Sequence, residues 1–335
     1  MSAVYHGGDL AGARALFPDA PQPWLDLSTG INAEPYPIGA ISAEAWTRLT
    51  DAGAVAALEA AAASAYGAPA AAIVAAPGTQ ALIQALPGLL PARNVAILDF
   101  TYAEHERVWR EAGAEVATVD DPAELTRADV GVIVNPNNPD GRLFSVEALF
   151  EIAEILARKG GTLVVDEAFA DVLPRAASLA PRLPQAGAVI LRSFGKAYGL
   201  AGLRLGFALG PPEFAQRLRR DLGPWAISGP AAEIGARALA DRAWLARATE
   251  RLTAGAARLD ALLTRAGMRV IGGTPLFRLA ESGGAERVFR RLGEAGILAR
   301  PFPARPDWLR FGIPGPVEDW ERLERGLSPS ALERR

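Results

Sequence analysis

The segment 193–206, with the sequence SFGKAYGLAGLRLG, places one lysine and one arginine in an apolar, glycine-rich setting. A lysine acts as a Schiff-base nucleophile only as the neutral amine, and partial desolvation of Lys196 in this setting would favour that form. Ser193, three residues earlier, and Arg204, eight residues later, could both bind the oxygens of one phosphate, the arginine through two parallel hydrogen bonds. A solvated loop lysine would be the alternative for an isolated motif. The combination indicates a covalently held phosphate cofactor, and pyridoxal 5′-phosphate fits this description.

Two more polar side chains follow apolar runs that predict buried strands. The run 162–165 ends in Asp166, whose carboxylate can pair with a protonated pyridine nitrogen. The run 130–134 leads into a Pro/Gly turn that contains Asn138, whose amide can donate to a phenolic oxygen. Because ligands of open α/β sheets bind at the carboxyl ends of the strands, both residues are candidates for the same site.

A third junction between a strand and a helix supplies candidate phosphate ligands. The apolar run 73–76 is followed by Gly78, Thr79 and Gln80 and then by a helical apolar pattern over residues 80–90. Backbone N–H groups at the start of a helix bind phosphate. The junction therefore predicts a further part of a phosphate site.

With these residues in this order, the chain resembles the fold-type I pyridoxal-phosphate enzymes of the class I and II aminotransferase branch, over nearly its whole length. The resemblance implies an α/β fold with a large domain, built on a mostly parallel, doubly wound sheet, and a small carboxyl-terminal α/β domain. It also implies that Lys196 binds the cofactor covalently and that Tyr102 stacks on the cofactor ring. The implied catalytic residues are Lys196, Asp166 and Tyr102. The implied cofactor-binding residues are Gly78, Thr79, Gln80, Tyr102, Asn138, Asp166, Phe169, Ser193, Lys196 and Arg204.

The composition excludes several other classes of protein. Among 335 residues, 35 Lys and Arg are interspersed with 38 Asp and Glu, without a basic run, so binding to nucleic acid is not expected. With no cysteine and two histidines, neither disulfides nor a metal site are expected. No signal-peptide pattern and no apolar run of membrane-spanning length occur, so we expect a cytoplasmic protein that does not bind a membrane.

Alternating apolar patterns predict the elements that position the site. The predicted strands lie near 73–75, 95–98, 115–119, 130–134, 162–166, 188–192 and 205–209, and then near 268–271, 276–280, 297–299 and 308–312. Helices are predicted over 54–66, 103–112, 145–158 (capped by Ser145) and about 231–265. We expect a substrate-covering arm over residues 1–35, a cofactor-binding domain over 36–228 and a small domain over 229–335.

Two arginines near the carboxyl terminus are candidate substrate ligands. The chain resembles the histidinol-phosphate aminotransferase group, which uses two such arginines to bind the anionic ends of the substrate. By this resemblance Arg310 would bind the α-carboxylate and Arg300 a second anionic group. The alternative is that both are surface residues of an arginine-rich domain.

Within that group the chain resembles the threonine-phosphate decarboxylases of cobalamin biosynthesis. The resemblance rests on the opening His6-Gly7-Gly8-Asp9, on the segment 25–32 that ends in Asn32, and on Phe169, where transaminases of the group usually carry tyrosine. Loss of that hydroxyl would remove a hydrogen bond to the phenolic oxygen of the cofactor and change its electronics. The implied substrate-binding residues are His6, Gly7, Asn32, Asn138, Arg300 and Arg310.

The resemblance implies decarboxylation of O-phospho-L-threonine to (R)-1-amino-2-propanol O-phosphate, with Arg310 orienting the carboxylate and Lys196 returning a proton to Cα. The alternative is a histidinol-phosphate or related amino-acid aminotransferase, which shares every cofactor residue. A binding module without catalysis is disfavoured because the lysine and its partners are all present. A homodimer is also implied, although Leu49 stands where related enzymes offer a tyrosine to the partner's cofactor.

Overall fold

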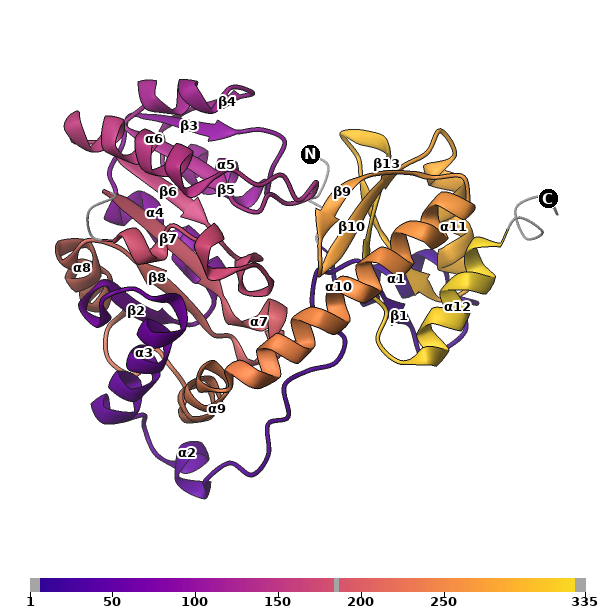
Figure 1. The fold of residues 1–335 in the computed structure, drawn as a ribbon, viewed down its shortest axis with the longest axis horizontal. Coiled ribbons are helices and arrows are strands. Elements are labelled where there is room, and N and C mark those ends of the chain that lie inside the picture. The colour runs from indigo at the N-terminus through magenta and orange to yellow at the C-terminus, as the bar shows by residue number, and fades with distance from the viewer. Residues whose placement is uncertain (1–6, 184–186, 329–335) are drawn as a thin grey trace. The chain divides into compact units, whose positions relative to one another are not determined.

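The structure is a computed structural model, and it describes residues 7–183 and 187–328 (Figure 1). The chain forms two compact units. The large unit takes its residues from 36–138 and 142–246, and the small unit from 1–35, 139–141 and 247–335. The boundary of the large unit lies after the predicted residue 228, because α9 (Gly229–Ala240) packs against α3 (Ala52–Tyr66).

Within the described residues, the large unit is built on a seven-stranded sheet. Its order is β2 (Ile73–Ala76), β8 (Gly206–Leu209), β7 (Ala188–Ser193), β6 (Thr162–Asp166), β5 (Val130–Val134), β3 (Asn94–Leu98) and β4 (Glu115–Val119). The pairs from β7 to β4 are parallel, whereas β8 is antiparallel to both β2 and β7. The central strands are continuous apolar runs because helices cover them on both faces. The predicted α/β fold with a mostly parallel sheet is confirmed.

Ser145 caps a helix of the large unit, as predicted, and Asp51 caps another. Ser145 accepts a hydrogen bond from the N–H of Ala148 and caps α6, and Asp51 caps α3 in the same way through Ala54. The other helices are α2 (Ala43–Thr47), α4 (Thr79–Leu89), α5 (Glu104–Glu111), α6 (Val146–Arg158), α7 (Phe194–Ala197) and α8 (Pro212–Leu222). None of the helices in the described part of the chain is long and apolar enough to span a membrane.

The prediction of a single helix over about residues 231–265 is wrong. The structure has α9 and then α10 (Arg242–Arg265), separated by Asp241. Asp241 leaves the helical conformation, and its carboxylate accepts a hydrogen bond from the N–H of Trp244, 2.9 Å away. An aspartate that caps the next helix ends the first one even though the apolar pattern continues.

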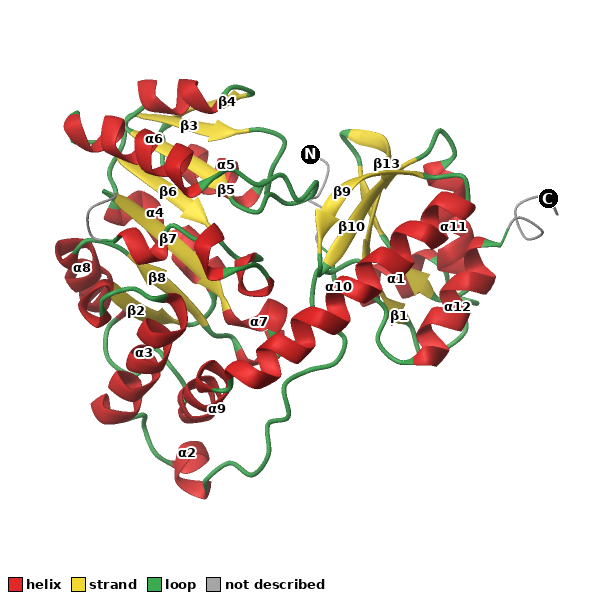
Figure 2. Cartoon of the chain, in the orientation of Figure 1, coloured by secondary structure: helices red, strands yellow, loops and turns green. Residues whose placement is uncertain are grey.

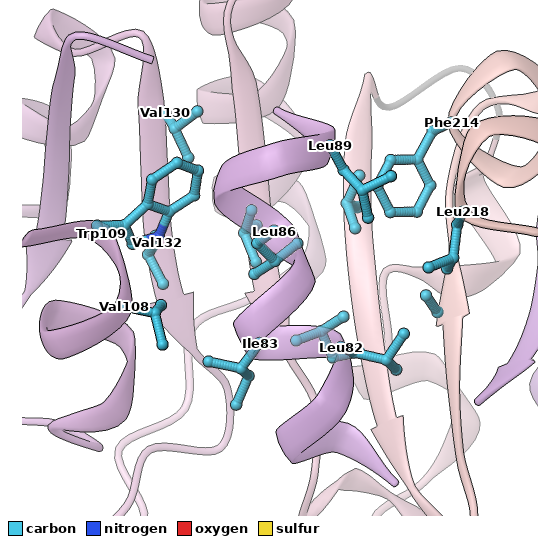
Figure 3. Close-up of a cluster of buried hydrophobic side chains, with 14 of the residues drawn as sticks. Leu82, Ile83, Leu86, Leu89, Val108, Trp109, Val130, Val132, Phe214 and Leu218 are labelled. Carbon is cyan, nitrogen blue, oxygen red and sulfur yellow. The ribbon is translucent and has the colours of Figure 1, made fainter. Parts of the chain in front are cut away.

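Helix α4 lies in the apolar core of the large unit (Figure 3). Its residues Leu82, Ile83, Leu86 and Leu89 are buried among side chains of α5, α8 and the sheet. Burial of a leucine or isoleucine side chain contributes about 1.5–3 kcal/mol to folding. The start of α4 is therefore held rigidly at the sheet edge where β2 ends.

The small unit contains a four-stranded antiparallel sheet and a two-stranded parallel one. The first has the order β12 (Arg300–Phe302), β13 (Arg305–Gly312), β10 (Phe277–Glu281) and β9 (Arg269–Thr274). The second pairs β1 (Leu25–Asp26) with β11 (Ile297–Leu298). Its helices are α1 (Leu10–Leu16), α10 from residue 247 onward, α11 (Ala285–Glu294) and α12 (Val317–Leu327), and α11 packs against α12 and β11 to β13 (Figure 2).

Candidate active site

The predicted cofactor residues of the large unit come from adjacent strand ends. Asp166 is the last residue of β6 and is 3% exposed, and its Cα is in register with Val134 of β5 and Leu191 of β7. The turn after β5 carries Asn138, which is buried. Helix α7, which contains Lys196, starts directly after β7. The topology thus brings an amide, a carboxylate and an amine to one edge of the sheet.

Asp166 has a buried histidine partner that the sequence reasoning missed. His105 Nε2 lies 3.0 Å from Asp166 Oδ2 and donates to it, since an ionised carboxylate only accepts. Asp166 Oδ1 accepts a hydrogen bond from the N–H of Ala168 at 3.0 Å. His105 is fully buried in the first turn of α5, and its Nδ1 has no hydrogen-bond partner within the described residues. In the sequence, the position of His105 on the apolar face of an amphipathic helix, three residues after Tyr102, could have indicated a buried histidine near the site.

The start of α4 and Arg204 form an anion cradle. Gly78 has a φ of +89°, and a Cβ added there would lie 2.8 Å from Nη2 of Arg204. A Cβ on Gly206 would lie 2.8 Å from the backbone N of Thr79, so both positions require glycine. No side chain of the described residues caps α4. The free N–H groups of the helix start and a guanidinium therefore lie next to each other, as a phosphate site requires.

Ser193 belongs to the same edge of the sheet. It pairs with Gly206 of β8, which in turn pairs with Ala76 at the end of β2. Ser193 is buried, and its hydroxyl does not cap α7. Arg204 adopts a left-handed conformation with a φ of 53°, and its Nη1 donates to the carbonyl of Ala201 at 3.0 Å. A non-glycine residue in this conformation is costly and is often held at functional sites.

The side chain of Gln80 is directed to Tyr102. Tyr102 Oη donates to Gln80 Oε1 at 3.1 Å, and Gln80 Nε2 donates to Glu104 Oε2 at 2.6 Å. Both ends of its side-chain amide are therefore engaged, and the backbone N–H of Gln80 lies in the first turn of α4. Tyr102 itself is half-buried and lies just before α5.

Phe169 lies beside the candidate nucleophile. Its ring is buried, and Lys196 Nζ is 5.4 Å from the ring centroid, which is within the range of a cation–π contact. Lys196 is half-buried. The ring of Phe169 therefore supplies part of the apolar surroundings of the amine.

A buried ion cluster lies directly behind the site residues in the chain. Arg192, which precedes Ser193, donates to Glu167 Oε2 at 2.7 Å and to Asp171. Glu167, which follows Asp166, also accepts from the hydroxyl of Ser178 at 2.6 Å. Burial by itself lowers the pKa of Arg192, but the carboxylates of Asp171 and Glu167 together raise it by more. The net pKa is therefore above its ordinary value, and the guanidinium stays charged. The cluster ties the ends of β6 and β7 together.

In the small unit, the two predicted arginines are cross-strand neighbours. Arg300 of β12 is directly opposite Arg310 of β13, so both side chains leave the same face of the sheet. Arg310 is buried, its Nη2 donates to the carbonyl of Ser28 at 2.8 Å, and its Cζ lies 5.1 Å from the ring centroid of Phe277. Like charges directly opposite each other are destabilising, and an anion bound to both would remove this cost.

Two more predicted substrate residues, Gly7 and Asn32, lie in the amino-terminal part of the small unit, whereas Asn138 belongs to the large unit. Asn32 is buried, and its Oδ1 accepts from Arg251 Nη2 at 3.2 Å and from the N–H of Glu34 at 3.1 Å. Gly7 packs so closely that an added Cβ would lie 2.4 Å from the carbonyl oxygen of Ser28, the group that Arg310 binds. His6 lies outside the described residues.

Comparisons with known proteins identify the family to which the chain belongs. Residues 23–325 match the family described as aminotransferase class I and II. Threonine-phosphate decarboxylases from Pseudomonas aeruginosa and from a Sinorhizobium species are both 42% identical to the chain, the first over 96% of each protein and the second over 99% of this chain and 100% of the relative. Histidinol-phosphate aminotransferase 1 from Cupriavidus pinatubonensis is 30% identical over 71% of this chain and 69% of its own length. The crystal structure of histidinol-phosphate aminotransferase from Sinorhizobium meliloti, in complex with pyridoxal 5′-phosphate, has a TM-score of 0.82 with 23% identity and covers 99% of both chains.

The chain therefore belongs to the class I and II aminotransferase family of pyridoxal-phosphate-dependent enzymes.

Proposed function

We propose that the protein is a pyridoxal-phosphate-dependent decarboxylase that converts O-phospho-L-threonine to (R)-1-amino-2-propanol O-phosphate in cobalamin biosynthesis. The observation that carries this proposal is the 42% identity to two threonine-phosphate decarboxylases over nearly the whole chain. The aminotransferase relative is less similar and matches a shorter part of the chain.

The residues of the large unit fit the cofactor. The anion cradle of Gly78, Thr79, Gln80 and Arg204, together with the hydroxyl of Ser193, would bind the phosphate group. Asp166, held by His105, would accept from the pyridine nitrogen, and Asn138 would donate to the phenolic oxygen. Tyr102 would stack on the ring, and Lys196 would form the covalent attachment. The bound cofactor supplies a sink for the electron pair released at the Cα of the substrate.

The charges of the small unit fit a substrate with two anionic groups. Arg310 would bind the α-carboxylate, while Arg300, His6, Gly7 and Asn32 would bind the phosphate. Because a guanidinium binds a carboxylate through two parallel hydrogen bonds, it fixes the direction of the bond that breaks. We also propose that the segment 1–35 covers the bound substrate.

Decarboxylation and transamination differ in the bond that is cleaved at Cα. In decarboxylation the carboxylate would leave as carbon dioxide, the electron pair of the broken bond would remain with the Cα side, and the protonated Lys196 would deliver one proton to that carbon and become a neutral amine. In transamination the Cα proton is removed, and the amine does not stay on the substrate. Phe169 supports the first outcome, since it offers no hydroxyl to the phenolic oxygen of the cofactor.

We further propose that the protein is a cytoplasmic homodimer. Among the described residues of the large unit, three large apolar side chains are more than 60% exposed, and exposed apolar surface of this kind is typical of an interface. They are Trp46, Leu49 and Trp225. Leu49 cannot donate a hydrogen bond, so the phosphate would depend on the anion cradle rather than on a tyrosine from the partner. Sedimentation equilibrium tests the dimer, and a monomer at micromolar concentration would contradict it.

The test of the proposed activity is carbon dioxide release from O-phospho-L-threonine by the holoenzyme. We expect release without any added keto acid, and no release by Lys196→Ala. A parallel reaction with histidinol phosphate and 2-oxoglutarate follows glutamate. Glutamate formation with no carbon dioxide in the first reaction would make the protein an aminotransferase.

A further inference from the structure

A chain of hydrogen bonds runs from the phenol of Tyr102 into the first turn of α5. Tyr102 Oη donates to Gln80 Oε1, and Gln80 Nε2 donates to Glu104 Oε2. Arg107 completes the chain, because its Nε donates to Glu104 Oε1 at 3.1 Å and its Nη2 to Glu104 Oε2 at 2.7 Å. We refer to these four residues, Tyr102, Gln80, Glu104 and Arg107, as the Tyr102 clamp.

The hydrogen-bond donors and acceptors of the Tyr102 clamp allow only one orientation of the side-chain amide of Gln80. Glu104 is 4% exposed, and a buried carboxylate must accept hydrogen bonds, so the NH₂ group of Gln80 faces it. The carbonyl oxygen of Gln80 then faces Tyr102 and can only accept. The Gln80 amide is thereby held by a charge-assisted bond to Glu104, which is stronger than a bond between neutral groups, and its carbonyl oxygen in turn fixes the phenol of Tyr102.

The same turn of α5 supports a second predicted cofactor contact. Glu104 is followed by His105, which holds the carboxylate of Asp166. The rings of Tyr102 and His105 are in edge contact, with centroids 6.2 Å apart. Two consecutive residues therefore fix the aromatic ring and the carboxylate that the proposed function assigns to the cofactor.

We propose that Gln80 and Glu104 are positioning residues that set the plane of the Tyr102 ring against the cofactor. This inference rests on the proposed binding of pyridoxal phosphate but not on the identity of the substrate. Gln80 thus has two separate parts: its backbone N–H belongs to the anion cradle, and its side chain orients the stacking residue.

A double-mutant cycle on the holoprotein tests this inference. The variants are Tyr102→Phe, which removes the hydroxyl but keeps the ring, Gln80→Met, which removes the amide but keeps the backbone N–H, and the double variant. The readouts are the visible circular dichroism of the bound cofactor and its dissociation constant. Each single variant should weaken cofactor binding about two- to tenfold and reduce the dichroic signal. The double variant should be no weaker than the more affected single variant, because both break the same connection.

Glu106→Gln is the matched control, since Glu106 lies in the same turn of α5 and pairs with Arg110 at 2.7 Å, outside the Tyr102 clamp. It should leave both readouts unchanged. If Gln80→Met does not fold, Glu104→Gln replaces it in the cycle with the same expectation. Effects of the two single variants that multiply in the double variant would overturn the inference and leave the proposed function intact. A wild-type protein that takes up no pyridoxal phosphate would overturn both.

Discussion

Arg192→Met removes the guanidinium from a buried ion cluster but keeps an unbranched apolar side chain; among the described residues the cluster is Arg192, Glu167 and Asp171, and Arg192 is its only cation. Their side chains are 6%, 0% and 5% exposed. Loss of the guanidinium leaves two carboxylates in the interior without their counter-charge. Breaking a buried pair in this way costs about 3–5 kcal/mol. Since domains are typically stable by about 5–15 kcal/mol, a loss of about 3–5 kcal/mol is roughly a fifth or more of the stability.

An exposed pair provides the matched control. Arg48 lies 3.2 Å from Glu44, and the two side chains are 73% and 70% exposed. Such a pair contributes about 0–1 kcal/mol, because solvent screens it. Arg48→Met should therefore change the free energy of unfolding by less than about 1 kcal/mol.

Urea denaturation followed by tryptophan fluorescence measures both variants. With a slope of about 3 kcal/mol/M, Arg192→Met should lower the midpoint by about 1 M or more. Adding Glu167→Gln and Asp171→Asn to Arg192→Met should recover much of the loss, since no uncompensated charge remains. Equal midpoints for Arg192→Met and Arg48→Met would refute the reasoning, as would a triple variant less stable than Arg192→Met.

Four other outcomes follow from the site and its surroundings. His105→Ala removes a charge-assisted hydrogen bond to Asp166 and should weaken pyridoxal-phosphate binding roughly tenfold, as measured by fluorescence titration. Hydrogen bonds from the backbone N–H groups of Asn94 and Arg93, at the start of β3, lower the pKa of Asp129. The carboxylate therefore stabilises the fold above its unfolded pKa, and this contribution is lost as the pH falls through the folded pKa. Asp129→Asn should flatten the decline of the urea midpoint below about pH 4. Phe169→Tyr should shift the pH titration of the cofactor's visible absorbance to lower pH, because the new hydroxyl stabilises the phenolate. Arg310→Lys keeps the positive charge but loses the two parallel N–H donors of the guanidinium, and it should raise the KM for O-phospho-L-threonine roughly tenfold or more in steady-state assays.

The strands of the large unit could be predicted because their signal is local. A run such as 130–134 is β-branched, apolar and bounded by turn residues, and β5 has those bounds. Several of the candidate cofactor residues could be proposed for the same reason, since they follow such a run. Asp166, for example, is the last residue of β6.

The missed features depend on contacts between distant residues. The roles of His105 and of the Gln80 side chain are visible only once α4, α5 and β6 pack together. The strand β12 was missed because its sequence is rich in arginine and proline, and an edge strand tolerates proline where a central one does not. Likewise, the pairing of β1 with β11 joins residues more than 270 positions apart, as the register of Leu25 with Ile297 shows.

The most direct test of the central claim is proton NMR of the holoenzyme reaction with O-phospho-L-threonine in deuterium oxide. Cleavage of the bond to the carboxylate should give 1-amino-2-propanol phosphate with one deuterium at carbon 1, because the proton that Lys196 delivers exchanges with solvent deuterons. A keto acid that retains its carboxylate and has lost its amine would contradict the account.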